Sequence, residues 1–204
     1  QIMLWEIAPD LPLLLRADPF GIFFATVASG LWLLTSFYSI GYMRGEGAVK
    51  QTRYFASFAV CLSATIGVAF SGNLLTFIIF YEILTVATYP LVIHNENKRA
   101  IAAGRKYLAY TLTAGLLLIA AAGITYSISG SIAFQPGGIF AEGSLTSTTA
   151  ISLFLLFLGG VGVKAGLMPV HSWLPSAMAA PTPVSALLHA VAVVKSGVFG
   201  IIRV

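Results

Sequence analysis

The sequence predicts an all-α fold, a polytopic bundle of transmembrane helices in which one helix is discontinuous. Hydrophobic residues make up 58% of the 204 residues and charged residues only 9%, whereas a soluble domain is about half apolar and about a quarter charged. Six apolar runs are long enough to span or nearly span a bilayer core of about 30 Å, which needs roughly 20 helical residues. The fifth run combines a lysine with glycines and a proline, and this mixture predicts a break in its helix.

The six apolar runs cover residues 20–43, 54–71, 73–93, 107–129, 149–169 and 183–203. Residues 1–19 are expected to form an interfacial loop because they contain Pro9, Asp10, Pro12, Arg16 and Asp18. We therefore divide the chain into residues 1–53, which hold this loop and the first span, and residues 54–204, a helix bundle. The chain starts with Gln1 and lacks a signal-peptide pattern, so we expect a fragment of a longer protein whose bundle is incomplete at the C-terminal end.

The charges in the connecting segments predict how the chain is oriented in the membrane. The first connection, residues 44–53, has a net charge of +2, and the third, residues 94–106, has four basic residues against Glu96. In an alternating topology these two connections lie on the same side, and the positive-inside rule makes that side cytoplasmic. The fifth connection should share this side, although it carries no lysine or arginine. We expect a multi-pass protein of the cell's inner (plasma) membrane, with the lipid bilayer as its first partner.

Several classes of protein are excluded by composition. The only cysteine, Cys61, lies in an apolar run, which argues against a disulfide framework and against a cysteine-based metal or iron–sulfur site. The net charge is +4, but the basic residues cluster at the ends of apolar runs, so we expect no nucleic-acid partner. A Rossmann glycine motif and a P-loop are both missing from the sequence. We expect no cofactor and no metal ion in this chain.

Three ionisable residues lie deep within apolar runs. Glu82 and Lys195 are near the middle of the third and sixth runs, and Lys164 lies in the fifth, close to Pro169. On insertion scales each costs roughly 2.5–3.5 kcal/mol at a helix centre, and intramembrane charges are functional by default. The structural alternatives are a side chain that reaches the interface and a buried ion pair with no function. A carboxylate and two amines in one bundle can also relay protons, because a desolvated lysine, unlike an arginine, can lose its proton.

The surroundings of Lys164 predict a broken helix. Pro169 removes a backbone donor and clashes with the preceding turn. Four glycines add to this weakening of the helix: Gly159, Gly160, Gly162 and Gly166. Non-helical backbone at membrane depth is tolerated where it lines protein or a watery cavity, and free helix ends there can hold an ion or a protonated amine. The alternative is a simple proline kink with a lysine that reaches the interface.

Two histidines in the last two runs are candidates for the same chemistry. His171 follows Pro169, and His189 lies six residues into the sixth run. Histidine titrates near neutral pH and can pass protons. Histidines can also ligate haem, but the depths of these two are poorly matched for a shared haem.

Three stretches of the sequence resemble the antiporter-like proton-translocating subunits. This family includes the large membrane subunits of respiratory complex I, Mrp-type sodium/proton antiporter subunits and membrane subunits of energy-converting hydrogenases. The stretch "MPVHSWLPSAMAAPTPVSALLHAVAVVKSGVFGIIR" resembles its signature, and "LTFIIFYEILTVATYPLVI" is similar to its glutamate-bearing helix. The stretch "LLLRADPFGIFFATVASGLWLLTSFYSIGYM" resembles its N-terminal segment.

The resemblance implies a role for each of the candidate residues. Glu82 and Lys164 would form a pair whose electrostatic coupling drives a proton through a half-channel, and Lys195 would pass it toward the middle of the membrane. His171 falls in the motif P-x-H-x-W-L-P, and His189 in S-A-L-L-H-A. The chain would hold most of one five-helix repeat of a larger inverted-repeat transporter. Its partners would be other membrane subunits, and its ions protons, with Na⁺ as an alternative.

The sequence leaves the parent complex open. After Arg105 and Lys106 the fourth run has no charge, which resembles the shorter subunits of the family, including the Mrp D-type. Complex I, an Mrp antiporter and a hydrogenase all remain candidates, and any oxidoreductase activity would belong to partner subunits. Two other classes also stay open: a membrane subunit that binds quinone or haem directly, and a purely structural assembly subunit.

Overall fold

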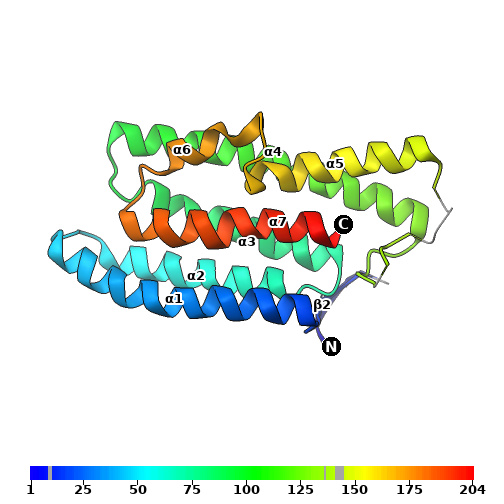
Figure 1. Ribbon diagram of the computed structural model, residues 1–204, viewed down its shortest axis with the longest axis horizontal. Helices are drawn as coiled ribbons and strands as arrows, with labels where there is room; N and C mark the ends of the chain where they lie inside the picture. Colours follow the sequence, from blue (N-terminus) through cyan, green and yellow to red (C-terminus); the bar gives the residue numbers. More distant parts are fainter. Residues whose placement is uncertain (9–10, 136, 141–144) are drawn as a thin grey trace.

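Long helices run side by side along the long axis of the molecule (Figure 1). The computed structural model describes residues 1–8, 11–135, 137–140 and 145–204, with the side chains of all of these except 8 and 188–190. Within this part of the chain six helical segments are long and apolar enough to span a membrane. The predicted all-α polytopic bundle is thus confirmed.

The spans follow the predicted runs closely. They are α1 (Pro19–Gly45), α2 (Gln51–Ala69), α3 (Leu74–Val92), α4 (Lys98–Ser129), α5 (Ser147–Ala165) with α6 (Trp173–Ala177), and the π-helical η2 (Val184–Val193) with α7 (Val194–Arg203). The main difference is that α4 starts at Lys98, nine residues before the predicted position. The Asn97 side chain caps this helix by accepting a hydrogen bond from the N–H of Ala100 at 2.7 Å, so helical structure extends into a charged segment that hydropathy assigned to a loop.

Residues 1–19 contain a β-hairpin where the sequence predicted only an interfacial loop. Strands β1 (Ile2–Ala8) and β2 (Leu11–Leu15) pair antiparallel. The hairpin docks on the turn between α2 and α3, where Leu14 accepts a hydrogen bond from the N–H of Gly72 at 2.8 Å and donates to the hydroxyl of Thr76 at 2.9 Å. The partners of these backbone groups are distant in the sequence, so local hydropathy does not predict the hairpin.

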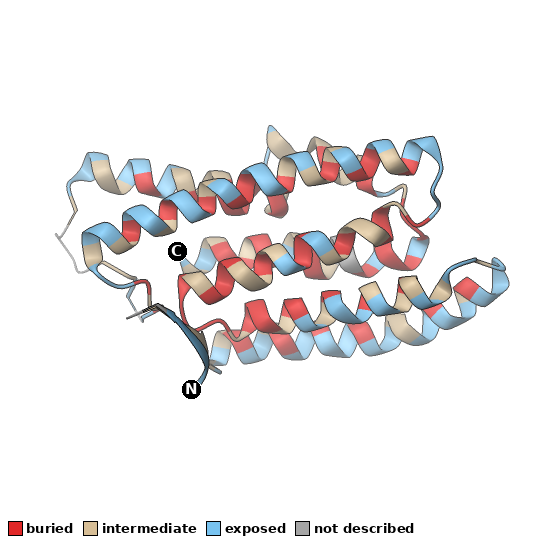
Figure 2. Ribbon diagram, turned by 180° about the vertical axis from the view of Figure 1, so that it is seen from behind, coloured by how far each residue is buried: buried red, intermediate tan, exposed pale blue. Residues whose placement is uncertain are grey.

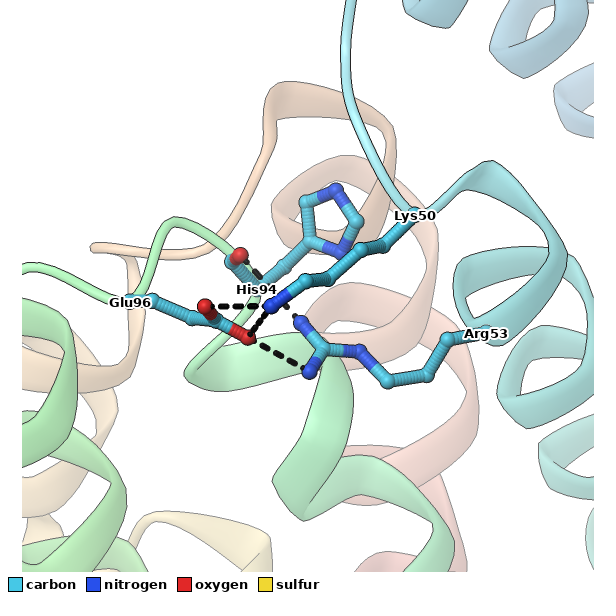
Figure 3. A network of polar contacts seen from close by, with 4 residues as sticks. All are labelled: Lys50, Arg53, His94 and Glu96. Atoms are coloured by element: carbon cyan, nitrogen blue, oxygen red, sulfur yellow. Dashed lines mark hydrogen bonds and ion pairs between the residues drawn. The ribbon is translucent and has the colours of Figure 1, made fainter.

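Contacts between the connecting segments confirm that the first, third and fifth connections share one end of the bundle. Glu96 forms ion pairs of 2.6 Å with both Lys50 and Arg53 (Figure 3). The side-chain amide of Asn95 donates to the carbonyl of Ala179 at 3.2 Å. The hairpin and the turns after α2 and α4 gather at the opposite end, as does the end of α7 (Figure 1).

The fifth span is discontinuous, as predicted, but the break begins later than the glycines suggested. Helix α5 stays regular through Gly160 and Gly162 and ends at Ala165, where Gly166 takes up a left-handed conformation with φ 74°. A short turn, η1 (Val170–Ser172), then leads into α6. Gly160 therefore does not break the helix. It permits close packing, since a Cβ there would lie 2.4 Å from Cγ of Leu118 in α4.

Buried residues form a stripe along the inner faces of the helices, whereas α1 and the outer face of α4 are largely exposed (Figure 2). Two clusters of buried apolar residues make up the core. One surrounds Trp173 and Tyr107 near the end with the first and third connections, and the other surrounds Phe77 and Phe199 toward the hairpin. In a membrane, the exposed apolar faces are those available to lipid or to other helices.

Candidate functional site

Lys164 lies in the last turn of α5, next to the break. Its side chain is fully buried. The ammonium group donates a hydrogen bond to the backbone carbonyl of Tyr81 in α3 and lies 3.3 Å from the centroid of the Tyr81 ring. A cation at this position interacts favourably with the negative end of the α5 dipole. The buried charge is thus held by a carbonyl, a ring and a helix end, none of which carries a full charge.

Tyr81 is the residue of this site that sequence reasoning missed. It is fully buried, and its hydroxyl approaches the carbonyls of Gly160 and Val161 in α5 at 3.4 Å each. Tyr81 therefore contacts the last turns of α5 with its ring, its hydroxyl and its backbone carbonyl. The sequence did offer a signal for Tyr81: it is an aromatic residue directly before Glu82. Aromatic faces and carboxylates both bind ammonium ions, so the two neighbours are both candidate partners of a buried lysine.

Glu82 follows Tyr81 but faces another helix. A Cβ on Gly115 of α4 would lie 2.6 Å from Oε1 of Glu82, so the carboxylate occupies the space that this glycine leaves. Both carboxylate oxygens are buried and accept no hydrogen bond from the residues that the structure describes. The Thr85 hydroxyl is close enough to interact with the carboxyl group, but it donates to the carbonyl of Tyr81 at 3.2 Å.

The structure places the Glu82 carboxylate against Gly115 of α4 and the Lys164 ammonium group against Tyr81, without joining the two groups. In the described part of the chain the ion pairs do not include one between these two residues. The two side chains nevertheless interact electrostatically. The site therefore holds a buried cation, Lys164, and a buried carboxyl group, Glu82, that interact but are not directly paired.

Lys195 is in a different environment. It is exposed and lines an apolar groove of about 320 Å³ between α1 and α7, with neighbours such as Phe24 and Val198. Gly197, two residues further along α7, faces α5, since a Cβ there would lie 2.3 Å from the backbone nitrogen of Ala165. Positions two apart on an α-helix lie on nearly opposite sides. The structure therefore does not bring Lys195 into contact with Lys164.

The histidines lie on either side of the fifth connection. His171 is in η1, half-buried, and its Nδ1 is buried without a hydrogen-bond partner among the described residues. The side chain of His189 lies outside the described residues, so a shared haem site stays an untested alternative. In the part of the chain that the structure covers, no group of three or more His, Cys, Asp or Glu side chains could hold a metal ion.

Residues 71–204 match the family model described as NADH:quinone oxidoreductase/Mrp antiporter, transmembrane region. This segment contains all five candidate residues.

Individual relatives agree with this match. The chain is 34% identical to the probable A/B subunit of a K(+)/H(+) antiporter from Rhizobium meliloti (strain 1021), over 93% of this chain and 19% of that protein. It is 36% identical to "Hydrogenase-4 component B" of Escherichia coli (strain K12), over 94% of this chain and 28% of that protein. The chain thus spans less than a third of the length of either relative.

A solved structure shares the fold. The Mrp complex from Dietzia sp. DQ12-45-1b contains a chain that superposes on 96% of this one with a TM-score of 0.85 and 24% identity, and 21% of that chain is covered.

Proposed function

The chain belongs to the NADH:quinone oxidoreductase/Mrp antiporter transmembrane family, and we propose that it moves protons part of the way across a membrane. Glu82, Lys164 and Lys195 form the half-channel in this proposal, and two histidines assist proton exchange: His171 in η1, at the break, and His189 in η2. The chain works as one part of a multisubunit membrane complex, of the complex I, Mrp or hydrogenase kind. Protons are its primary ion, with Na⁺ as an alternative coupling ion.

The observation that carries the proposal is the placement of Lys164. Its ammonium group is fully buried with only uncharged groups as direct partners, while the carboxyl group of Glu82 is buried close by and unbonded. A buried carboxylate and a buried ammonium ion are each costly unless paired. The site is therefore suited to two arrangements, one with Lys164 on Tyr81 and one with Lys164 on Glu82.

Switching between these arrangements is sufficient to move a proton. A direct pair at about 4 Å and an effective dielectric constant near 20 is worth about 4 kcal/mol, roughly a thousandfold in a protonation equilibrium. When Lys164 leaves Glu82 for Tyr81 it loses this stabilisation, and its Nζ can release a proton. The amine becomes neutral, and water or the imidazole of His171 accepts the proton.

Passage from Lys164 to Lys195 needs an intermediate carrier. The two side chains face different neighbours, so water or a rearrangement of η2 must connect them. π-Helical stretches are rare, and those that occur are frequently at functional sites. The π-helical η2 lies directly before α7, which carries Lys195. The segment is therefore the element we expect to change when the proton passes.

The first test replaces Glu82 with glutamine in the full-length protein within its native complex. Glu82→Gln keeps the size and the polarity of the side chain but removes the charge that Lys164 would need. We expect proton transport into inverted membrane vesicles, followed with a pH-sensitive dye, to fall by at least about a hundredfold, as for other essential proton-transfer groups. The assembled complex should be recovered in normal amounts.

Glu6→Gln is the matched control, because Glu6 is exposed on β1 and its replacement removes the same charge away from the site. It should leave transport unchanged. Full transport by Glu82→Gln would refute the half-channel. Unchanged transport by Lys164→Ala would instead indicate a purely structural assembly subunit.

A further inference from the structure

The start of α4 carries an excess of positive charge. Four basic residues lie between positions 98 and 106 and no acidic residue lies among them: Lys98, Arg99, Arg105 and Lys106. Two of these cations are in the first helical turn, where they oppose the positive end of the helix dipole. An anion bound near this turn would relieve both sources of repulsion.

The carboxylate in the preceding connection is already engaged. Glu96 accepts hydrogen bonds of 2.6–2.7 Å from Lys50 and Arg53 (Figure 3). Hydrogen bonds from these two residues hold the pKa of Glu96 below its usual value, so it is ionised at neutral pH and bound to cations from α2 and its N-terminal flank. In the described ranges of the chain, no carboxylate forms an ion pair with Arg99 or Lys106.

Two of the four cations line a cavity between α4 and α6. Its volume is about 420 Å³, and its lining residues are Arg99, Ala102, Ala103, Lys106, Pro175 and Ser176. Arg99 and Lys106 are two helical turns apart and therefore lie on the same face of α4. Lys98 and Arg105, one residue before each of them, do not line the cavity. The basic segment of α4 thus has two faces: Arg99 and Lys106 line the cavity, and Lys98 and Arg105 lie outside it.

Ser176 positions one of the two cations. Lys106 donates a hydrogen bond to the hydroxyl of Ser176 at 3.2 Å, and this hydroxyl donates to the carbonyl of Ser172 at 3.1 Å. The ammonium group is thereby fixed at the wall of the cavity, with further protons available to an acceptor. Its partner Arg99 is exposed, and its guanidinium can bind a phosphate through two parallel hydrogen bonds.

The length and the charge pattern of α4 indicate that the cavity lies at the level of lipid head groups. Helix α4 has 32 residues, which correspond to about 48 Å at about 1.5 Å per residue, whereas the hydrocarbon core is about 30 Å thick. The uncharged part of α4 begins at Tyr107, so Arg99 and Lys106 precede the segment that crosses the core. The remaining lining, Ala102, Ala103 and Pro175, is apolar and suited to the glycerol and upper acyl part of a lipid.

We propose that this cavity binds the head group of an anionic phospholipid, whose phosphate is held by Arg99 and Lys106. Basic pockets between transmembrane helices are sites for anionic head groups. The excess of positive charge at the start of α4 favours binding of an anion. The apolar lining of the cavity at this depth favours a lipid over a soluble phosphate or an acidic protein segment. Since α6 follows the break in the fifth span, a bound lipid would join the start of α4 to the second half of the discontinuous helix.

The test compares two double variants of the full-length protein, purified within its complex and placed in nanodiscs of phosphatidylcholine with phosphatidylglycerol. Arg99→Gln/Lys106→Gln removes the two cations that line the cavity. Lys98→Gln/Arg105→Gln removes the same charge from the same segment but outside the cavity. Native mass spectrometry after mild delipidation measures the phosphatidylglycerol retained. We expect the first variant to retain about tenfold less than the unmodified complex, and the second to retain a normal amount.

Equal losses in the two double variants would overturn the proposal, because they would show only the general attraction of a basic surface. Normal retention by Arg99→Gln/Lys106→Gln would also overturn it. Inorganic phosphate that displaces the lipid at low millimolar concentration would indicate a site for a free anion, and an acidic partner subunit cross-linked at Arg99 would indicate a protein contact. If the double variant does not assemble, Arg99→Gln alone is compared with Lys98→Gln, since both side chains are exposed.

Discussion

At the scale of single residues, the site depends on two neighbours that face different helices. Tyr81 contacts α5 and Glu82 contacts α4, because consecutive positions on a helix differ in direction by about 100°. The ammonium group of Lys164 therefore has two alternative partners nearby: the ring and backbone carbonyl of Tyr81, or the carboxylate of Glu82. The space that holds the Glu82 carboxylate exists because Gly115 has no side chain.

Gly115→Ala should change the site while keeping the fold. The three atoms nearest to the new methyl group all belong to the far end of the Glu82 side chain, which can move. We expect thermal stability close to that of the unmodified protein and proton transport lowered by about tenfold or more, since small displacements of reacting groups have effects of this size. Transport in inverted vesicles and thermal unfolding in detergent measure the two effects.

Gly123→Ala is the control for this substitution, because an added methyl group at Gly123 in the same helix would meet none of the described residues within 4 Å. It should leave both measurements unchanged. A Gly115→Ala variant that transports normally would show that the observed position of the Glu82 carboxylate is unimportant for transport.

At the scale of helices, the contact between α5 and α7 is set by backbone approach. Gly197 lies against the end of α5, where a Cβ would meet the nitrogen of Ala165 at 2.3 Å and the carbonyl oxygen of Val161 at 2.8 Å. Small residues allow transmembrane helices to approach closely in this way. The contact holds α7 against the break and sets the direction in which Lys195 projects.

Gly197→Ala should therefore destabilise the bundle. Because the atoms in its way belong to the backbone, α5 and α7 must move apart, and we expect a loss of about 1–3 kcal/mol in the free energy of unfolding. Unfolding in mixed detergent micelles with increasing dodecyl sulfate measures this loss. Gly30→Ala in α1 is the control, since a Cβ there has open space among the described residues. Equal stability of the two variants would contradict the close approach of α5 and α7.

At the scale of the whole molecule, the two ends of the bundle are closed by different polar clusters. One end has the pairs of Glu96 with Lys50 and Arg53. At the other end Asp18, the N-cap of α1, pairs with Arg203 of α7 at 2.6 Å, and both side chains are largely buried. The second pair joins helices from opposite ends of the sequence.

The pair of Asp18 and Arg203 predicts a dependence of stability on acid. Partial burial acts to raise the pKa of Asp18, but the backbone N–H of Gly21 and the guanidinium of Arg203 outweigh burial and hold this pKa below its usual value. A carboxyl group with a lowered folded pKa stabilises the fold fully above its unfolded pKa of about 3.9. This stabilisation is lost as the pH falls through the folded pKa.

Asp18→Asn tests this dependence, because asparagine also caps helices well but cannot form the ion pair. At pH 7 we expect the variant to be less stable by about 2 kcal/mol, the size of a charged hydrogen bond. The difference between the two proteins should shrink as the pH is lowered from about 4 toward 2. Thermal unfolding in detergent across this pH range provides the measurement, and a difference that is constant with pH would contradict the assignment.

The sequence by itself determined the membrane spans, the break in the fifth span and the residues that carry charge inside the membrane. Hydropathy and the residue types at a break are local properties, so six spans and the positions of Glu82, Lys164 and Lys195 could be predicted from neighbouring residues alone. The shared end of the first and third connections also followed, because an alternating chain leaves no other choice.

Only the tertiary structure decided what each charge touches. Lys164 and its acceptor Tyr81 are 83 positions apart. The docking of the hairpin on the turn after α2 and the packing of Glu82 against Gly115 also bring together segments that are distant in the chain. Hydropathy places a helix in the membrane but says little about its rotation, because lipid and protein are both apolar. Rotation is set by the packing of small residues such as Gly160 and Gly197, and it is this packing that turned Lys164 toward Tyr81 and Lys195 toward α1.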